Sequence, residues 1–171
     1  MNRMMQRRHV LGMVAVGALA GCGFRLRGQV SLPFRQLVIT GVQGGVTQAL
    51  QQALALNEVK VWRDDAAEAS SASWRLQVAQ DRTSRQVVGT VVSGRVREIE
   101  LGVQFAYALY PATAQPNDEP VLRDQLELVQ DMSYEESAAL AKATEEATLL
   151  RDMQARAAQS VLRRLAAWGG R

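Results

Sequence analysis

The chain offers few side chains that could act as nucleophiles or metal ligands. Among its 171 residues are one cysteine, Cys22, and one histidine, His9. Both lie in a segment that we expect to be processed on export, so the mature protein would keep no imidazole and no free thiol. That excludes Ser-His-Asp and Cys-His catalysis and the usual zinc, haem and iron–sulfur ligand sets, so we expect no metal and no cofactor. Any catalysis would fall to carboxylates or to Lys60 and Lys142, the two lysines of the chain.

The first 22 residues have the pattern of a bacterial lipoprotein signal. Residues 1–8 carry three arginines and no acid, and residues 10–20 are apolar apart from their glycines, a run too short to span a bilayer as a helix. Leu19-Ala20-Gly21-Cys22 then resembles the site at which lipoproteins are cleaved and acylated. We therefore expect residues 1–21 to be a signal peptide, Cys22 to carry the lipid, and residues 22–34 to form a lipid-anchored segment. An ordinary signal peptide with a chance cysteine is the alternative, and the sequence leaves the export route open.

The excess of positive charge belongs to this signal segment. The whole chain has 20 basic and 17 acidic residues, a formal net charge of +3. Residues 1–21 contain three of the arginines and no acid, so the mature chain is formally neutral and gives no reason to expect nucleic acid as a partner. The remaining charge is unevenly placed. Residues 75–97 hold five arginines against one aspartate, whereas residues 118–136 hold seven acids against one arginine.

Hydrophobic periodicity predicts a single α+β domain over residues 35–168. We expect helices at 44–57 and from about 134 to 168, with Gly169 ending the second. Either Ser133 with Glu136, or Thr144, could cap the start of that long helix. The expected strands are 36–40, 59–62, 74–79, 86–93, 98–109 and 122–132, and the clearest alternation places Ile99, Leu101, Val103, Phe105, Tyr107 and Leu109 on one face.

This element order predicts a two-layer sandwich, in which one mostly antiparallel sheet of four to five strands carries two helices on one face.

The start of the mature chain gives a more specific indication. Cys22-Gly23-Phe24-Arg25-Leu26-Arg27 resembles the start of the LptE family of lipopolysaccharide-assembly lipoproteins. The similarity continues through Leu37-Val38-Ile39, through the helix-to-strand passage at residues 49–59, and to Ala139-Leu140-Ala141-Lys142 before the last helix. Element order and length are similar over essentially the whole mature chain.

The resemblance implies a non-enzymatic lipoprotein on the periplasmic side of the outer membrane. It implies a plug inside the LptD β-barrel, forming a heterodimer with that barrel, assisting its folding and engaging lipopolysaccharide. A neutral chain with finely mixed charges suits the polar lumen of a large barrel. Gly23, where some lipoproteins have aspartate, resembles the second residue of lipoproteins that are sent to the outer membrane.

Three cations are candidate lipopolysaccharide ligands. Lys142 matches the lysine of the family's Ala-Leu-Ala-Lys segment, which the resemblance implicates in binding lipopolysaccharide. Arg85 and Arg95 lie on either side of the expected hairpin turn, and guanidinium groups bind phosphate bidentately. The family's aromatic–arginine pair in this turn is not matched by Val91-Val92-Ser93-Gly94. For each cation, the alternative is an ordinary solvated side chain.

A hydrolase using paired carboxylates is the alternative from another functional class. Glu98 and Glu100 lie two residues apart on one face of the expected strand, and neighbouring carboxylates can perform acid–base catalysis. Outward-facing acids on an antiparallel strand are usually only solvated, and an enzyme would need a deep pocket around them. A generic envelope or barrel-assembly lipoprotein is a further alternative, although it would not explain the start at Cys22.

Overall fold

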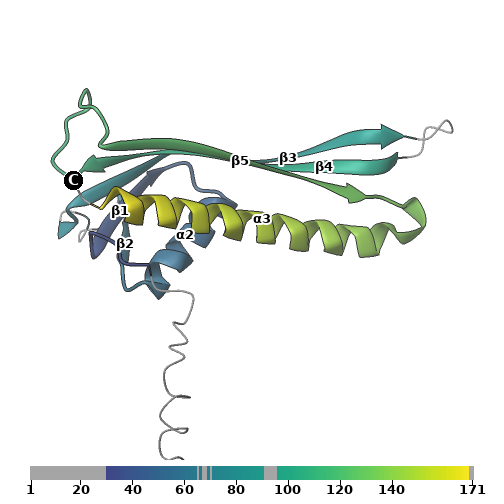
Figure 1. The fold of residues 1–171 in the computed structure, drawn as a ribbon, viewed down its shortest axis with the longest axis horizontal. Coiled ribbons are helices and arrows are strands. Elements are labelled where there is room, and N and C mark those ends of the chain that lie inside the picture. Colours follow the sequence, from purple (N-terminus) through teal and green to yellow (C-terminus); the bar gives the residue numbers. More distant parts are fainter. Residues whose placement is uncertain (1–29, 65, 67–68, 70, 91–95, 170–171) are drawn as a thin grey trace, which may run out of the picture.

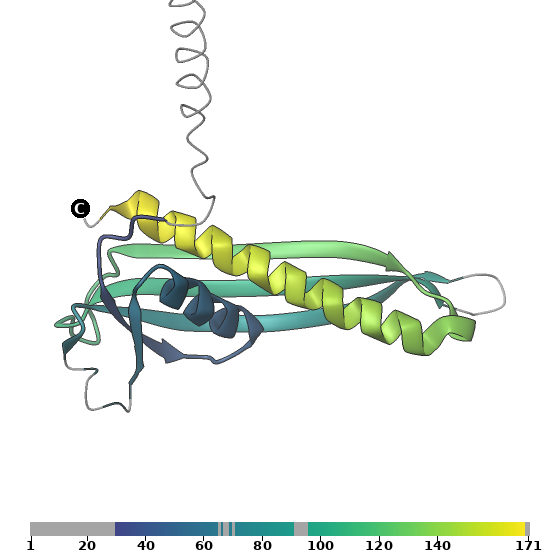
Figure 2. The same cartoon turned by 90° about the horizontal axis from the view of Figure 1, so that it is seen from below.

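The protein is a two-layer α+β structure, as the sequence predicts. The computed structural model describes residues 30–64, 66, 69, 71–90 and 96–169. Its five strands form one sheet in the order β2–β1–β3–β4–β5. The strands are β1 Gln36–Gly41, β2 Lys60–Arg63, β3 Trp74–Thr90, β4 Val96–Pro111 and β5 Leu122–Ser133. Helices α2 (Gly45–Leu56) and α3 (Ala139–Trp168) cover the same face, and α3 runs along the three long strands (Figures 1 and 2).

The sheet is mixed, although its long pairings are antiparallel. The first strand, β1, pairs in parallel with both β2 and β3, whereas β4 pairs antiparallel with β3 and with β5. The prediction of separate strands at 74–79 and 86–93 was wrong, because β3 is continuous from Trp74 to Thr90. The intervening residues are polar and lack the apolar alternation of a strand, but their backbone pairs with β4 throughout. Residues 91–93 lie outside the described part.

The hydrophobic core lies between the sheet and the two helices. The predicted apolar face of β4, from Ile99 to Leu109, is at most 1% exposed at each of its six positions. Met153, Ala157, Val161 and Leu165 of α3 pack against this core, as the helical periodicity predicts. Within the described residues, no helix covers the opposite face of the sheet (Figure 1).

The long helix begins without either of the predicted caps. A short 3-10 helix, η2 (Glu136–Ala138), leads into α3, and the residue before α3, Ala138, makes no side-chain capping hydrogen bond. Thr144 lies inside the helix, where its hydroxyl donates to the Leu140 carbonyl at 3.2 Å. Gly169 ends α3 in a left-handed conformation with φ of 68°, as predicted.

A β-bulge determines how α2 is capped. The pairing with β4 shifts between Val78 and Gln80, so Ala79 has no partner and Asp81 lies opposite Phe105 on the helix-covered face. There the Asp81 carboxylate accepts hydrogen bonds from the Thr47 amide at 2.8 Å and the Val46 amide at 3.3 Å. A Cβ on Gly44 would lie 2.4 Å from Asp81 Cγ, so this close approach requires glycine. Asp81 therefore caps the helix N-terminus from another element of the fold.

Candidate functional site

The first predicted ligand residue, Lys142, connects the start of α3 to the end of β5. Its ammonium group donates to Ser133 Oγ at 3.2 Å and to Glu145 Oε2 at 2.9 Å. The Lys142 side chain is only 19% exposed, whereas that of Glu145 is 54% exposed. Lys142 is therefore a partly covered, paired cation rather than a freely solvated one.

The second predicted ligand residue, Arg85, lies on the same side of the sheet as α3. Arg85 is opposite Leu101, so its side chain belongs to the helix-covered face. Its Nε lies 3.2 Å from both carboxylate oxygens of Glu146, and 46% of the side chain remains exposed. Exposed pairs of this kind contribute at most about 1 kcal/mol, so a strongly bound anion can displace the glutamate.

These contacts bring Lys142 and Arg85 to one region of the molecule, which we call the distal cluster. It consists of Arg85, Ser133, Lys142, Glu145 and Glu146. Residues 142 and 146 are four apart in α3 and thus share one face of the helix. Arg95 and Cys22, the other two predicted site residues, lie outside the described residues.

Two exposed apolar residues are close in sequence to the cations of the distal cluster, and neither was predicted as a site residue. Leu140, two residues before Lys142, is 85% exposed, and Val87, two residues after Arg85, is 48% exposed. Val87 lies opposite Ile99, so it is on the same face as Arg85. Their sequence signal is an apolar residue two positions from a cation and outside the core periodicity. Arg85 and Val87, which share one strand face, suit a ligand that joins an anionic and an apolar part. Leu140 lies on another side of α3 from Lys142, because residues two apart in a helix do not share a face.

The carboxylates considered for catalysis lie on the uncovered face of the sheet. Glu98 is exposed and Glu100 is half-buried. Glu98 is opposite Ser133 and beside Gly89, and Glu100 is opposite Asp131 and Gln86. In the part of the chain that the structure describes, no group of three or more His, Cys, Asp or Glu side chains could hold a metal ion.

The uncovered face is polar and has a shallow centre. Gln80 donates to Gln104 at 2.7 Å, and Gln104 donates to Glu127 at 2.9 Å, so a hydrogen-bonded row crosses three strands. Beside this row, a depression of about 560 Å³ lies over the small residues Ala106 and Ala108. This face can therefore form hydrogen bonds to a polar surface that lies against it.

Within the described ranges, no helix is both long and apolar enough to cross a bilayer.

The fold is that of a group of small bacterial lipoproteins. The solution structure of lipoprotein B from Nitrosomonas europaea matches with a TM-score of 0.66 and 30% identity, covering 85% of this chain and 92% of that one. The crystal structure of the rare lipoprotein B from Shewanella oneidensis matches with a TM-score of 0.59 and 27% identity, covering 77% and 94%.

Sequence comparison places the chain within this group. The chain belongs to the LptE family of lipopolysaccharide-assembly proteins, and the family's sequence pattern matches residues 28–165. It is also 30% identical over 161 residues to the LPS-assembly lipoprotein LptE of Pectobacterium atrosepticum, covering 91% of this chain and 82% of that protein. The resemblance noted in the sequence is thus confirmed. The chain is a lipoprotein of a family that acts in lipopolysaccharide transport and assembly.

Proposed function

We propose that this protein is an outer-membrane lipoprotein that associates with an LptD-like β-barrel as its plug and assembly factor, and that binds lipopolysaccharide during its transport. In this proposal residues 1–21 are removed, Cys22 is acylated on the periplasmic side, and residues 35–168 form the domain that meets the barrel. The family match over residues 28–165 is the observation that carries the proposal.

The uncovered face of the sheet supports the association with a barrel. Large outer-membrane barrels have polar lumens, and the row Gln80–Gln104–Glu127 offers donors and acceptors to such a wall. The mature chain is formally neutral, so it brings no large net charge into a confined lumen. A sheet with helices on only one face can also have its other face in water. The polar face therefore agrees with the proposal, which is based on the family match.

The distal cluster supports lipopolysaccharide binding. Lipid A presents phosphate groups next to acyl chains, and the cluster combines the cations Arg85 and Lys142 with the exposed side chain of Val87, which lies on the same strand face as Arg85. In this proposal the phosphates displace Glu146 and Glu145 from the two cations, and Arg95, which lies outside the described residues, is a third cationic ligand.

Charge reversal at the cluster tests the ligand site. Lys142→Glu is expected to weaken binding to purified lipopolysaccharide by about ten-fold or more, because charge-assisted hydrogen bonds are lost and repulsion is added. Arg163→Glu, also on α3 but among its last residues, is the matched control and should change binding by less than about two-fold. Both variants should still co-purify with the barrel. Unchanged binding in Lys142→Glu and in Arg85→Glu and Arg95→Glu would show that the site is elsewhere.

We also propose that the protein acts by binding and not as an enzyme. The family is one of assembly factors, and Glu98 and Glu100 lie on the open face of the sheet, where Glu98 is exposed to solvent. A carboxylate hydrolase would instead lose its activity in Glu98→Gln and Glu100→Gln, so any hydrolysis that depends on those two residues would contradict this part of the proposal.

A further inference from the structure

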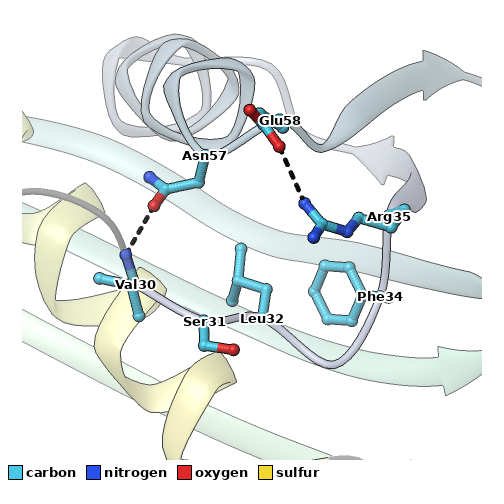
Figure 3. A pocket seen from close by; sticks show the side chains of 7 residues that line it. All are labelled: Val30, Ser31, Leu32, Phe34, Arg35, Asn57 and Glu58. Atoms are coloured by element: carbon cyan, nitrogen blue, oxygen red, sulfur yellow. Dashed lines mark hydrogen bonds and ion pairs between the residues drawn. The ribbon is translucent and has the colours of Figure 1, made fainter.

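The chain that leads from the proposed lipid anchor is fixed to the domain from residue 30 onward. The Val30 amide donates to Asn57 Oδ1 at 2.7 Å (Figure 3). Asn57 Nδ2 in turn donates to the Ala53 carbonyl at 2.8 Å. One side chain thus joins the incoming segment to the C-terminus of α2. Farther along, Phe34 is 5% exposed and Leu32 packs against the core, so the segment is held by apolar contacts as well.

A second connection follows immediately at Glu58. The Val59 amide donates to Leu54 O and the Glu58 amide to Ala55 O, both at 3.0 Å, which is the Schellman arrangement of a helix end. Glu58 has φ of 60°, a left-handed conformation that glycine adopts more easily. Its carboxylate lies 3.3 Å from Arg35 Nη1, so the residue that bears this strain also holds the incoming segment (Figure 3).

This attachment limits how far the domain can lie from a bilayer. Eight residue steps separate Cys22 from Val30, and a fully extended chain covers at most about 3.6 Å per step, or about 29 Å in all. A helix of 30 residues such as α3 is about 45 Å long. If Cys22 is acylated, the side of the domain around Val30 and Asn57 therefore stays near the lipid while the far end of α3 need not.

The surface beside this attachment suits a lipid headgroup region. Leu56, the last residue of α2, is 79% exposed although it adjoins Asn57. Arg35 and Lys60 are both exposed and are joined by a backbone hydrogen bond of 2.9 Å. Because Arg35 is paired with the exposed Glu58, Arg35, Lys60 and Glu58 together carry a net charge of about +1. A modest positive charge together with an exposed apolar side chain is typical of surfaces that rest on anionic membranes.

We infer that the anchor-side surface, formed by Leu56, Arg35 and Lys60, stays outside the barrel lumen and lies against the bilayer that holds the lipid anchor. This inference depends on the proposed acylation of Cys22. The domain itself would then contact the membrane, in addition to the acyl chains. The distal cluster would lie away from this contact, because Leu140 and Lys142 are at the N-terminal end of α3, whereas the anchor-side segment lies near its C-terminal half (Figure 2).

A pair of labelled positions tests the inference. Acylation leaves the mature chain without another thiol, so Leu56→Cys and Leu140→Cys each introduce a unique site for an environment-sensitive fluorophore. These are two leucines of similar exposure, 79% and 85%. The full lipidated protein is placed in phosphatidylcholine–phosphatidylglycerol vesicles that contain a headgroup-region quencher lipid. Quenching at position 56 should exceed that at position 140 by about three-fold or more, because apolar contacts enter about 5–10 Å into the interface.

Substitution of Asn57, whose side chain joins Val30 to the end of α2, provides the matched control. With the label at position 56, Asn57→Ala removes the acceptor for the Val30 amide and should lower the quenching, whereas Asn57→Asp keeps an acceptor oxygen and should preserve it. Equal quenching at the two positions, or none at position 56, overturns the inference. Flotation with the vesicles and the mass of the acylated N-terminus report separately on Cys22. If the protein floats with the vesicles but a label at position 56 is not quenched, the anchor-side surface does not contact the bilayer. If the N-terminus is not acylated, the proposed lipid anchor at Cys22 is wrong.

Discussion

The cap that Asp81 supplies to α2 leads to a prediction about stability. Asp81→Ala removes the acceptor of the Val46 and Thr47 amides, which lie in the first turn of α2. The Thr47 hydroxyl, now 2.7 Å from Asp81, is also 3.3 Å from the Val42 carbonyl and can turn to it. The net loss is therefore two amide hydrogen bonds and a favourable charge at a helix N-terminus, or about 2–3 kcal/mol. Asp81→Asn keeps one acceptor oxygen and should cost about 1 kcal/mol.

Urea unfolding of the purified mature protein measures this loss. A destabilisation of 2–3 kcal/mol should lower the midpoint by about 1 M while the slope of the free energy against urea is unchanged. The control is Asp131→Ala, which removes an exposed carboxylate from β5 and should change the free energy of unfolding by less than about 0.5 kcal/mol.

A double variant tests the geometry behind this prediction. The three heavy atoms nearest to a Cβ on Gly44 all belong to the Asp81 side chain, so Gly44→Asp alone should be destabilising. In the Asp81→Ala background that space is empty, and an aspartate at residue 44, the local N-cap position with extended backbone, should restore about 1 kcal/mol. The same substitution thus changes sign between the two backgrounds. If Asp81→Ala proves neutral, or if Gly44→Asp is equally harmful in both backgrounds, the tertiary cap does not stabilise α2.

Three further predictions follow from single residues. Glu58→Gly should raise the free energy of unfolding by up to about 1 kcal/mol in urea, because glycine accepts the φ of 60° without strain; a loss would mean that the pair with Arg35 outweighs the strain. Burial, with a smaller contribution from Asp124, raises the pKa of Tyr107 well above its usual 10, and the buried hydroxyl has no hydrogen-bond partner among the described residues. As the pH rises, the unfolded chain therefore loses this proton before the folded protein does. Above pH 10 the free energy of unfolding of the wild-type protein should fall by about 1.4 kcal/mol per pH unit more than that of Tyr107→Phe. If the free energies of the two proteins change in parallel with pH, this prediction is wrong. Glu146→Gln should strengthen lipopolysaccharide binding about two- to five-fold by releasing Arg85, whereas an equal effect of the exposed control Glu136→Gln would indicate a general charge effect.

The parts of the fold that were predictable are those in which one residue pattern decides the structure. The alternation from Ile99 to Leu109 identified β4 and its buried face, and Asn57 and Gly169 were correctly placed at helix ends. The continuous β3 was not predictable, because residues 80–85 are polar and become a strand only through pairing with β4. The bulge at Ala79 leaves no local signal, so the capping role of Asp81, 34 residues from Thr47, also requires the tertiary structure.

The site was predictable as a set of cations but not as an arrangement. The sequence placed Arg85 in a basic hairpin and Lys142 near the start of the last helix, and the structure brings both to one face of α3. Their glutamate partners could not be assigned, since the pair between Arg85 and Glu146 spans 61 residues. Arg95 and Cys22 remain predictions, because they lie outside the described residues. The hydrogen bond from the Val30 amide to Asn57 was likewise not predictable, because it joins segments 27 residues apart.

Co-purification shows whether the protein works as the partner of an outer-membrane barrel. The lipidated protein, tagged at its C-terminus, is isolated from detergent-solubilised outer membranes, and the proteins that accompany it are identified by mass spectrometry. We expect a stable one-to-one complex with a β-barrel protein of much larger mass. Recovery of the protein as a lone monomer from the same membranes, with no barrel attached, would contradict it.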